Sequence, residues 1–162
     1  GLTFWKTGEH WQARPGDDRK SKLYNKIREL LCRRKAAAQP LSLVFTKVNQ
    51  VVRGWINYFK IGGMKYFLFK FSQWLRHKIR VVIIKQWKLP RRIYTNLMRI
   101  NKALKCNFSD EDIHKVANTR LGWYKRSTGH VVNFLLSPKV LGISKADRPG
   151  LVDPLEYYLS RR

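Results

Sequence analysis

The adjacent aspartates Asp17-Asp18 are the first residues in the sequence whose types could support catalysis. Paired carboxylates can hold two metal ions that activate a nucleophile and stabilise a leaving group. A two-metal pair of this kind lies on a hairpin between apolar strands, whereas this pair follows Pro15-Gly16 and precedes two basic residues. We therefore interpret it as the start of a helix, with a side-chain cap and a favourable interaction with the helix dipole.

The cysteines and histidines show no spacing typical of metal ligands or of a disulfide framework. We interpret the two cysteines, Cys32 and Cys106, as free thiols of a reducing compartment, which favours a cytoplasmic location. The histidines are scattered along the chain: His10, His77, His114 and His130. The acidic residues are also few and scattered, and the sequence has no glycine-rich phosphate loop and no nucleophile elbow. We therefore predict no catalytic residues, no metal site and no cofactor in this chain.

The charge is the strongest compositional signal. The chain has 34 Lys and Arg against 10 Asp and Glu, a formal net charge of +24. The 80 residues from Leu30 to Ser109 contain 18 Lys and Arg and no acidic residue. Self-repulsion at this density opposes a compact state, so we expect a polyanionic partner, and nucleic acid fits best. A membrane fits less well, because the cations are spread over several predicted helices and no apolar run approaches the ~20 residues of a membrane span.

Apolar periodicity predicts a mostly α fold built on three antiparallel helices. The expected helices are Arg19–Ala37, a second from a cap at Ser42 to about Lys60, and Lys65–Leu89. Their breaks are Gln39-Pro40, Gly62-Gly63 and Pro90. Hydrophobic residues at 44%, including 13% aromatic residues, suffice for a core.

Smaller elements flank this three-helix bundle. We expect Gly1–Trp5 to be the end of a β-strand whose partners are missing, followed by a loop from Lys6 to Asp18. After Pro90 we expect a helical module with helices at Arg91–Leu104 and Asp110–Asn118 and a further turn at Ser137-Pro138. The tail to Arg162 looks short and partly ordered. The predicted units are therefore residues 1–18, 19–90 and 91–162.

One stretch resembles a known family. Residues 53–59, Arg-Gly-Trp-Ile-Asn-Tyr-Phe, with Asn49 four positions upstream, resemble the signature of the maturase-specific domain, or domain X, of group II intron-encoded reverse transcriptases. Gln50 stands where the family usually has Pro. Residues 122–127 resemble a segment downstream of domain X, and residues 1–4 resemble the end of the family's palm.

The resemblance implies a C-terminal part of such a protein, comprising the helical thumb and an adjoining nucleic-acid-binding segment. Proteins of this family bind their intron RNA, stabilise its spliced fold and reverse-transcribe it during retrohoming. The expected partners are group II intron RNA and target DNA or a template–primer duplex. Mg²⁺ is expected only for the missing palm. The family's endonuclease domain is excluded here, because two cysteines cannot supply its paired cysteine motifs.

The predicted nucleic-acid contacts are cations that would neutralise phosphates, aromatic residues that would stack on unpaired bases, and neighbouring polar residues. They are Arg53, Asn57, Tyr58, Lys60, Arg76, Lys78, Arg80, Lys85, Trp87, Lys88, Arg91, Arg92, Trp123, Tyr124, Lys125, Arg126 and Ser127. We expect the cations of the third helix to face outward, and Asn57 has a structural hydrogen bond as its alternative role. Trp55 and Trp74 are assigned to the core, and Gly54 to close helix packing.

Two other functions fit the same residues. In the first alternative, the chain is the thumb of an active polymerase whose palm is supplied elsewhere. In the second, it is a stand-alone helical binder of structured RNA. Preference for group II intron RNA over another folded RNA at matched salt would separate the maturase from the general binder.

Overall fold

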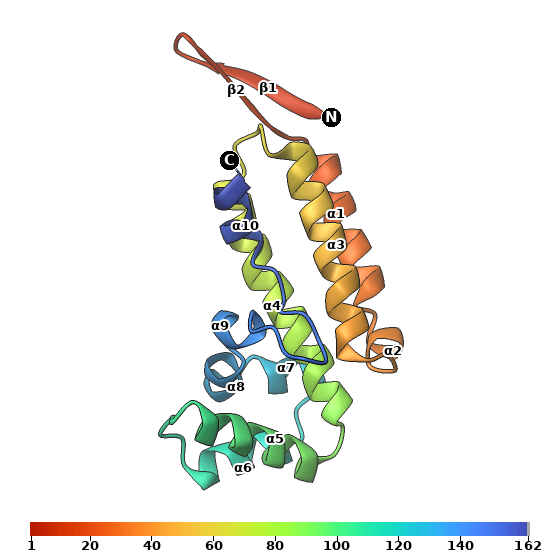
Figure 1. Ribbon diagram of the computed structural model, residues 1–162, viewed down its shortest axis with the longest axis vertical. Helices are drawn as coiled ribbons and strands as arrows, with labels where there is room; N and C mark the ends of the chain where they lie inside the picture. The colour runs from red at the N-terminus through yellow and green to blue at the C-terminus, as the bar shows by residue number, and fades with distance from the viewer. Residues whose placement is uncertain (162) are drawn as a thin grey trace.

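The computed structural model describes residues 1–161, apart from the side chain of Arg33. Helices make up 66% of the chain, which confirms the predicted mostly α fold (Figure 1). The strands are β1, Leu2–Thr7, and β2, His10–Pro15. The helices are α1, Asp17–Leu30; α2, Arg33–Ala36; α3, Leu41–Phe59; α4, Lys65–Trp87; α5, Pro90–Ala103; α6, Asp110–Asn118; α7, Trp123–Ser127; α8, His130–Leu135; α9, Pro138–Leu141; and α10, Pro154–Arg161.

The N-terminal strand has its partner in the segment that follows it. β1 and β2 form an antiparallel hairpin that runs from the pair Leu2–Pro15 to the pair Thr7–His10. Gly8 makes the tight turn possible, because its φ of +63° is unfavourable for residues with a Cβ. The expectations of a missing partner and of a loop from residue 6 to residue 18 were therefore wrong. The amide of Gly63 donates to the carbonyl of Ala13 at 2.8 Å, which ties the hairpin to the α3–α4 turn.

The three long helices α1, α3 and α4 form the bundle, in alternating directions (Figure 1). Their apolar stripes meet in the core. The fully buried members include Ile27, Phe45, Val48, Ile56, Leu68, Phe71, Leu75 and Ile79. This packing follows directly from the 3.6-residue period of the sequence, since each helix buries one apolar face.

The first helix is shorter than expected and begins differently. α1 ends at Leu30, and the separate short helix α2 follows. The side-chain amide of Gln86 donates to the carbonyls of Ala36 and Gln39 at 3.1 and 2.8 Å, so α4 holds this turn. At the other end Gly16 is the N-cap and no side chain caps the helix. The expected dipole interaction is present, because both aspartates lie in the first turn.

The helices after residue 90 pack together at one end of the bundle, and the chain then returns along it. α5 lies against α6 and α8, and α7 lies against α4. Residues 144–153, which we call the strap, lead back to α10, which packs against α3 and α4 (Figure 1). A boundary at residue 90 stays a prediction, but α10 is spatially part of the bundle.

Asn49 fixes the strap to α3. Its buried side chain, 3% exposed, donates to the carbonyl of Gly150 at 2.8 Å and accepts from the amide of Val152 at 2.9 Å. Further along, the hydroxyl of Tyr158 donates to the carbonyl of Gly62 at 2.9 Å. One buried amide thus satisfies two backbone groups of the strap, which no secondary-structure ladder pairs.

We predict that Asn49→Ala destabilises the protein by about 2–4 kcal/mol, because it leaves a buried N–H and a partly buried C=O without partners. Gln50→Ala, at the exposed neighbouring position, is the control and should change stability by less than about 0.5 kcal/mol. Urea denaturation followed by circular dichroism measures both. Equal stability of the two variants would show that the strap does not depend on this amide.

Candidate nucleic-acid interface

α1 presents cations on both of its flanks. Its inward positions are apolar, so five basic residues occupy the remaining faces: Arg19, Lys20, Lys22, Lys26 and Arg28. On one flank, a groove of about 590 Å³ separates α1 from α3. Arg19, Lys22 and Lys26 line one wall of this α1–α3 groove, and Trp55 and Tyr58 line the other.

Gly54 lies in the same groove. A Cβ built at this position would meet no atom within 4 Å, and the residue is exposed. The assignment of Gly54 to close helix packing was therefore wrong. Trp55 does pack against the core, with its ring centroid 4.8 Å from that of Phe59, but it remains half-buried. Tyr58 is 75% exposed, so its ring is free to contact another molecule.

On its other flank, α1 forms a face of alternating aromatic rings and cations with α4. The ring of Tyr24 meets that of Trp74 edge-on at 4.7 Å. The Arg28 guanidinium lies over both rings, at 5.6 and 5.5 Å, and Lys78 Nζ lies 5.8 Å from the centre of the Trp74 ring. Trp74 therefore combines its expected core packing with a place in this α1–α4 face. Cations held over aromatic faces keep their charge available to an anionic partner.

The α1–α4 face continues to α7. Arg28, Lys78 and Tyr124 line a pocket of about 350 Å³ beside Cys32, so two of the predicted contacts, Lys78 and Tyr124, come together there. Lys125 on the same short helix is exposed. Ser127, in contrast, is fully buried and donates to the carbonyl of Trp123 at 2.8 Å, so its predicted contact with nucleic acid was wrong.

Two predicted cations of α4 serve internal contacts. Arg80 is only 8% exposed, and its Nε donates to the carbonyl of Leu136 at 2.9 Å, so the expectation that it faces outward was wrong. All residues from Ile79 to Ile84 are buried, because other elements surround α4 at this level. Burial and the neighbouring Arg76 lower the pKa of Arg80 to about 10, so it is still charged at neutral pH.

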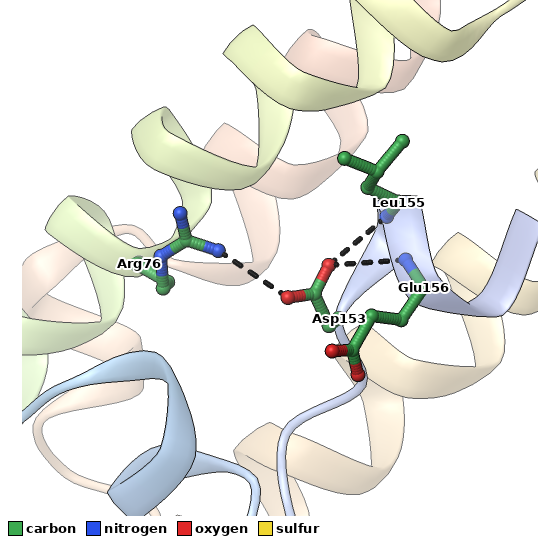
Figure 2. A network of polar contacts seen from close by, with 4 residues as sticks. All are labelled: Arg76, Asp153, Leu155 and Glu156. Atoms are coloured by element: carbon green, nitrogen blue, oxygen red, sulfur yellow. Dashed lines mark hydrogen bonds and ion pairs between the residues drawn. The ribbon is translucent and has the colours of Figure 1, made fainter. Parts of the chain in front are cut away.

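Arg76 is also held inside the fold. Its guanidinium lies 3.7 Å from the carboxylate of Asp153 in the strap (Figure 2). The other carboxylate oxygen accepts from the amides of Leu155 and Glu156, at 3.0 and 3.3 Å, and so caps α10 (Figure 2). Burial lowers the pKa of Arg76, and Asp153 opposes this shift.

The signature residues of α3 meet α10. Asn57 accepts a hydrogen bond from the hydroxyl of Tyr157 at 3.2 Å, and the Arg53 guanidinium lies 5.9 Å from the centre of the same ring. Asn57 thus makes the structural hydrogen bond that was its alternative role. Both side chains are nevertheless exposed, as is Lys60 at the end of α3.

The other predicted contacts fall into two places. At the α4–α5 junction, Lys88, Arg91 and Arg92 are exposed, while Lys85 and Trp87 are half-buried. In α7, the Arg126 guanidinium lies 4.8 Å from the centre of the Trp123 ring, and its Nη2 donates to the carbonyl of Thr119 at 2.6 Å. Trp123 and Arg126 are therefore largely engaged within the protein.

The cations of α1 were not among the predicted contacts. Their signal was present, because Lys and Arg fill the positions around the stripe formed by Leu23 and Ile27. Asp17, Asp18 and Glu29 lie among these cations, so α1 falls outside the acid-free interval and the contrast of its charge pattern is lower. Within residues 1–161, no group of three or more His, Cys, Asp and Glu residues could hold a metal ion. None of the described helices is long and apolar enough to cross a membrane.

His77 couples the α4–α7 contact to pH. Its ring centroid lies 4.2 Å from that of Tyr124, and its buried Nε2 has no hydrogen-bond partner among the described residues. Burial, followed by the charges of Lys78 and Arg80, lowers the pKa of His77 below its ordinary value of 6.5. As the pH falls through about 6.5, the unfolded chain takes up a proton that the folded chain resists.

We therefore expect stability to fall on acidification from pH 7.5 to pH 5.5, and His77→Gln to reduce that fall. Urea midpoints at the two pH values measure the effect. Gln73→Ala, at an exposed position of α4, is the control and should keep the pH dependence of the unsubstituted protein. The same fall in His77→Gln and in the control would exclude His77 as its source.

The geometry agrees with a comparison to known families. Residues 20–100, half of the 162 residues, match the family described as the group II intron, maturase-specific domain. The matched range runs from Lys20 in α1 into α5, and so contains most of the three long helices, the α1–α3 groove except Arg19, and the residues that α1 and α4 contribute to the α1–α4 face. No curated protein matches the chain. The match to half of the chain, together with the signature in α3, shows that this protein belongs to the group II intron maturase-specific domain family.

Proposed function

We propose that this maturase-domain protein binds group II intron RNA through the surface around α1. By holding the RNA in its spliced fold, it assists splicing and, as part of a reverse transcriptase, retrohoming. The observation that carries the proposal is the placement of five cations on α1 between two aromatic walls. A basic helix flanked by partly exposed rings suits a strand whose phosphates are charged and whose bases are unpaired.

The two flanks of α1 would act differently. In the α1–α3 groove, Lys22 and Lys26 would neutralise phosphates, while Tyr58 offers a ring for stacking. On the α1–α4 face, Arg28 and Lys78 are fixed over rings, which limits the conformational entropy that they lose on binding. Phosphate contacts of this kind set position and affinity, but base contacts and RNA shape set specificity.

The same surface would serve reverse transcription by contacting a template–primer duplex or target DNA. The nucleotidyl transfer itself would take place in a palm domain with Mg²⁺. This chain would bind and position the nucleic acid and would take no part in catalysis.

The first test compares a group II intron RNA with a structured RNA of the same length in binding titrations across salt concentrations. Tighter binding to the intron at every salt concentration is expected. Equal affinity for both RNAs would reduce the function to general binding of structured RNA. Absence of binding at low salt would reject the proposal.

The contribution of α1 can be measured from the salt dependence. We predict that Lys22→Ala/Lys26→Ala lowers the slope of log affinity against log salt by about 1.4–1.8, since each lost phosphate contact removes about 0.7–0.9. Lys115→Ala/Lys139→Ala removes the same charge from α6 and α9 and should leave the slope nearly unchanged. An equal loss in both variants would mean that only net charge matters.

Gly54 allows a test that does not change charge. Gly54→Leu should preserve or raise stability, by up to about 1 kcal/mol, because a helix interior disfavours Gly and the space at this position is open. It should weaken binding to the intron RNA at least fivefold, because the side chain enters the groove. Gln73→Leu adds the same side chain to an exposed position of α4 and should leave affinity unchanged. If Gly54→Leu bound the intron RNA as tightly as the unsubstituted protein, the RNA would not occupy the α1–α3 groove.

A further inference from the structure

A second pocket lies at the end of the bundle far from the hairpin, where α3 begins and α4 ends. Its volume is about 300 Å³, and α5, α9 with the preceding Leu136, and the strap complete its walls. It shares no residue with the α1–α3 groove. This volume is at the lower limit of small-molecule sites, about 300–1,000 Å³, so the pocket suits one compact group rather than a length of strand.

Three cations from distant parts of the sequence line this pocket: Arg99 of α5 and Lys145 and Arg148 of the strap. Two backbone hydrogen bonds, Lys145 N to Arg148 O at 2.9 Å and Arg148 N to Lys145 O at 3.3 Å, close a tight turn that holds the two strap cations near each other. Asp147 is the one acidic residue among the described lining residues, so three positive charges face one negative charge. The pocket therefore favours an anion.

Arg148 gives the sharpest indication of what the pocket binds. Its guanidinium lies 4.9 Å from the centre of the Phe45 ring, and its Nη1 is shielded from solvent and donates to no described atom. A buried N–H without an acceptor is costly, so such a group commonly marks a functional contact. Arg148 also lines the pocket, where an anion would offset part of the desolvation of its guanidinium.

The remaining walls suit a ligand with both a phosphate and a planar body. The first residues of α3, Leu41 and Ser42, line the pocket, and this helix has neither a side-chain cap nor an acidic residue in its first turn. Their amides therefore add to the positive potential. Trp87 and Ile100 supply apolar surface on the opposite elements.

We propose that this pocket binds a single nucleotide, with its phosphate among Arg99, Lys145 and Arg148 and its base or ribose against Trp87. The inference rests on the proposed function in one respect, since an intron RNA strand would be one source of the nucleotide. A free mononucleotide would be the other source. The recognising chemistry is the same in both cases.

Two measurements on the full chain test the pocket and distinguish the sources. Calorimetric titration with adenosine monophosphate, adenosine and inorganic phosphate at matched ionic strength tests the free nucleotide. Affinity for intron RNA tests the strand. Arg148→Met keeps a long side chain over Phe45 without the charge, and Arg99→Met is an exposed second variant. Lys102→Met, one turn further along α5, removes the same charge outside the pocket and is the control.

We expect adenosine monophosphate to bind more tightly than phosphate or adenosine. Both pocket variants should weaken this binding at least fivefold, and the control should not. In another outcome, the mononucleotide fails to bind while the pocket variants still lose more RNA affinity than Lys102→Met does. That result would assign the pocket to a nucleotide within the RNA strand. If neither measurement separates the pocket variants from the control, or if phosphate alone binds as tightly as the nucleotide, the inference is overturned. RNA binding that still depends on Lys22 and Lys26 would leave the proposed function intact in that case.

Discussion

One buried amide holds the C-terminal return of the chain against the bundle. Asn49 joins α3 to backbone groups of Gly150 and Val152, which lie 101 and 103 positions further along the chain. With the strap in this position, Asp153 reaches Arg76 and α10 covers the seam between α3 and α4. The family signature thus includes a residue whose contacts are structural, while Tyr58, nine positions later, faces outward.

The high positive charge of this protein restricts where its Lys and Arg side chains can lie. Most cations lie at the surface, where water and a polyanion can reach them. Among the described side chains, Arg80 is the most deeply buried cation, and it is matched by a backbone carbonyl rather than by a carboxylate. A buried cation with a neutral acceptor keeps its full charge, so the interior adds to the positive potential instead of cancelling it. A polyanionic partner would relieve this repulsion, which links binding to stability.

The local patterns of the sequence were enough for the long helices but not for what joins them. Leu23 and Ile27, or Val48 and Ile56, repeat at helical spacing and are buried as that spacing requires. The same reasoning failed for Arg80, because it assumes one buried face and α4 is enclosed on all sides there. β2 was missed since its residues are mostly exposed and show no buried alternation. The α1–α3 groove and the cation-lined pocket depend on side chains from distant segments, which no spacing rule brings together.

The strap also determines when the bundle can be completed during synthesis. Ribosomes add about 5–20 residues per second, so Asn49 waits roughly 5–20 s for the residues that it will bind. Until then the seam between α3 and α4 is uncovered, and Arg76 has no carboxylate beside it. Contacts so far apart in sequence also form slowly, because a long loop must close before they stabilise the fold. Closure of the seam by α10 is therefore a late step of folding, and until then Arg76 stays a cation without its acidic partner at an uncovered seam.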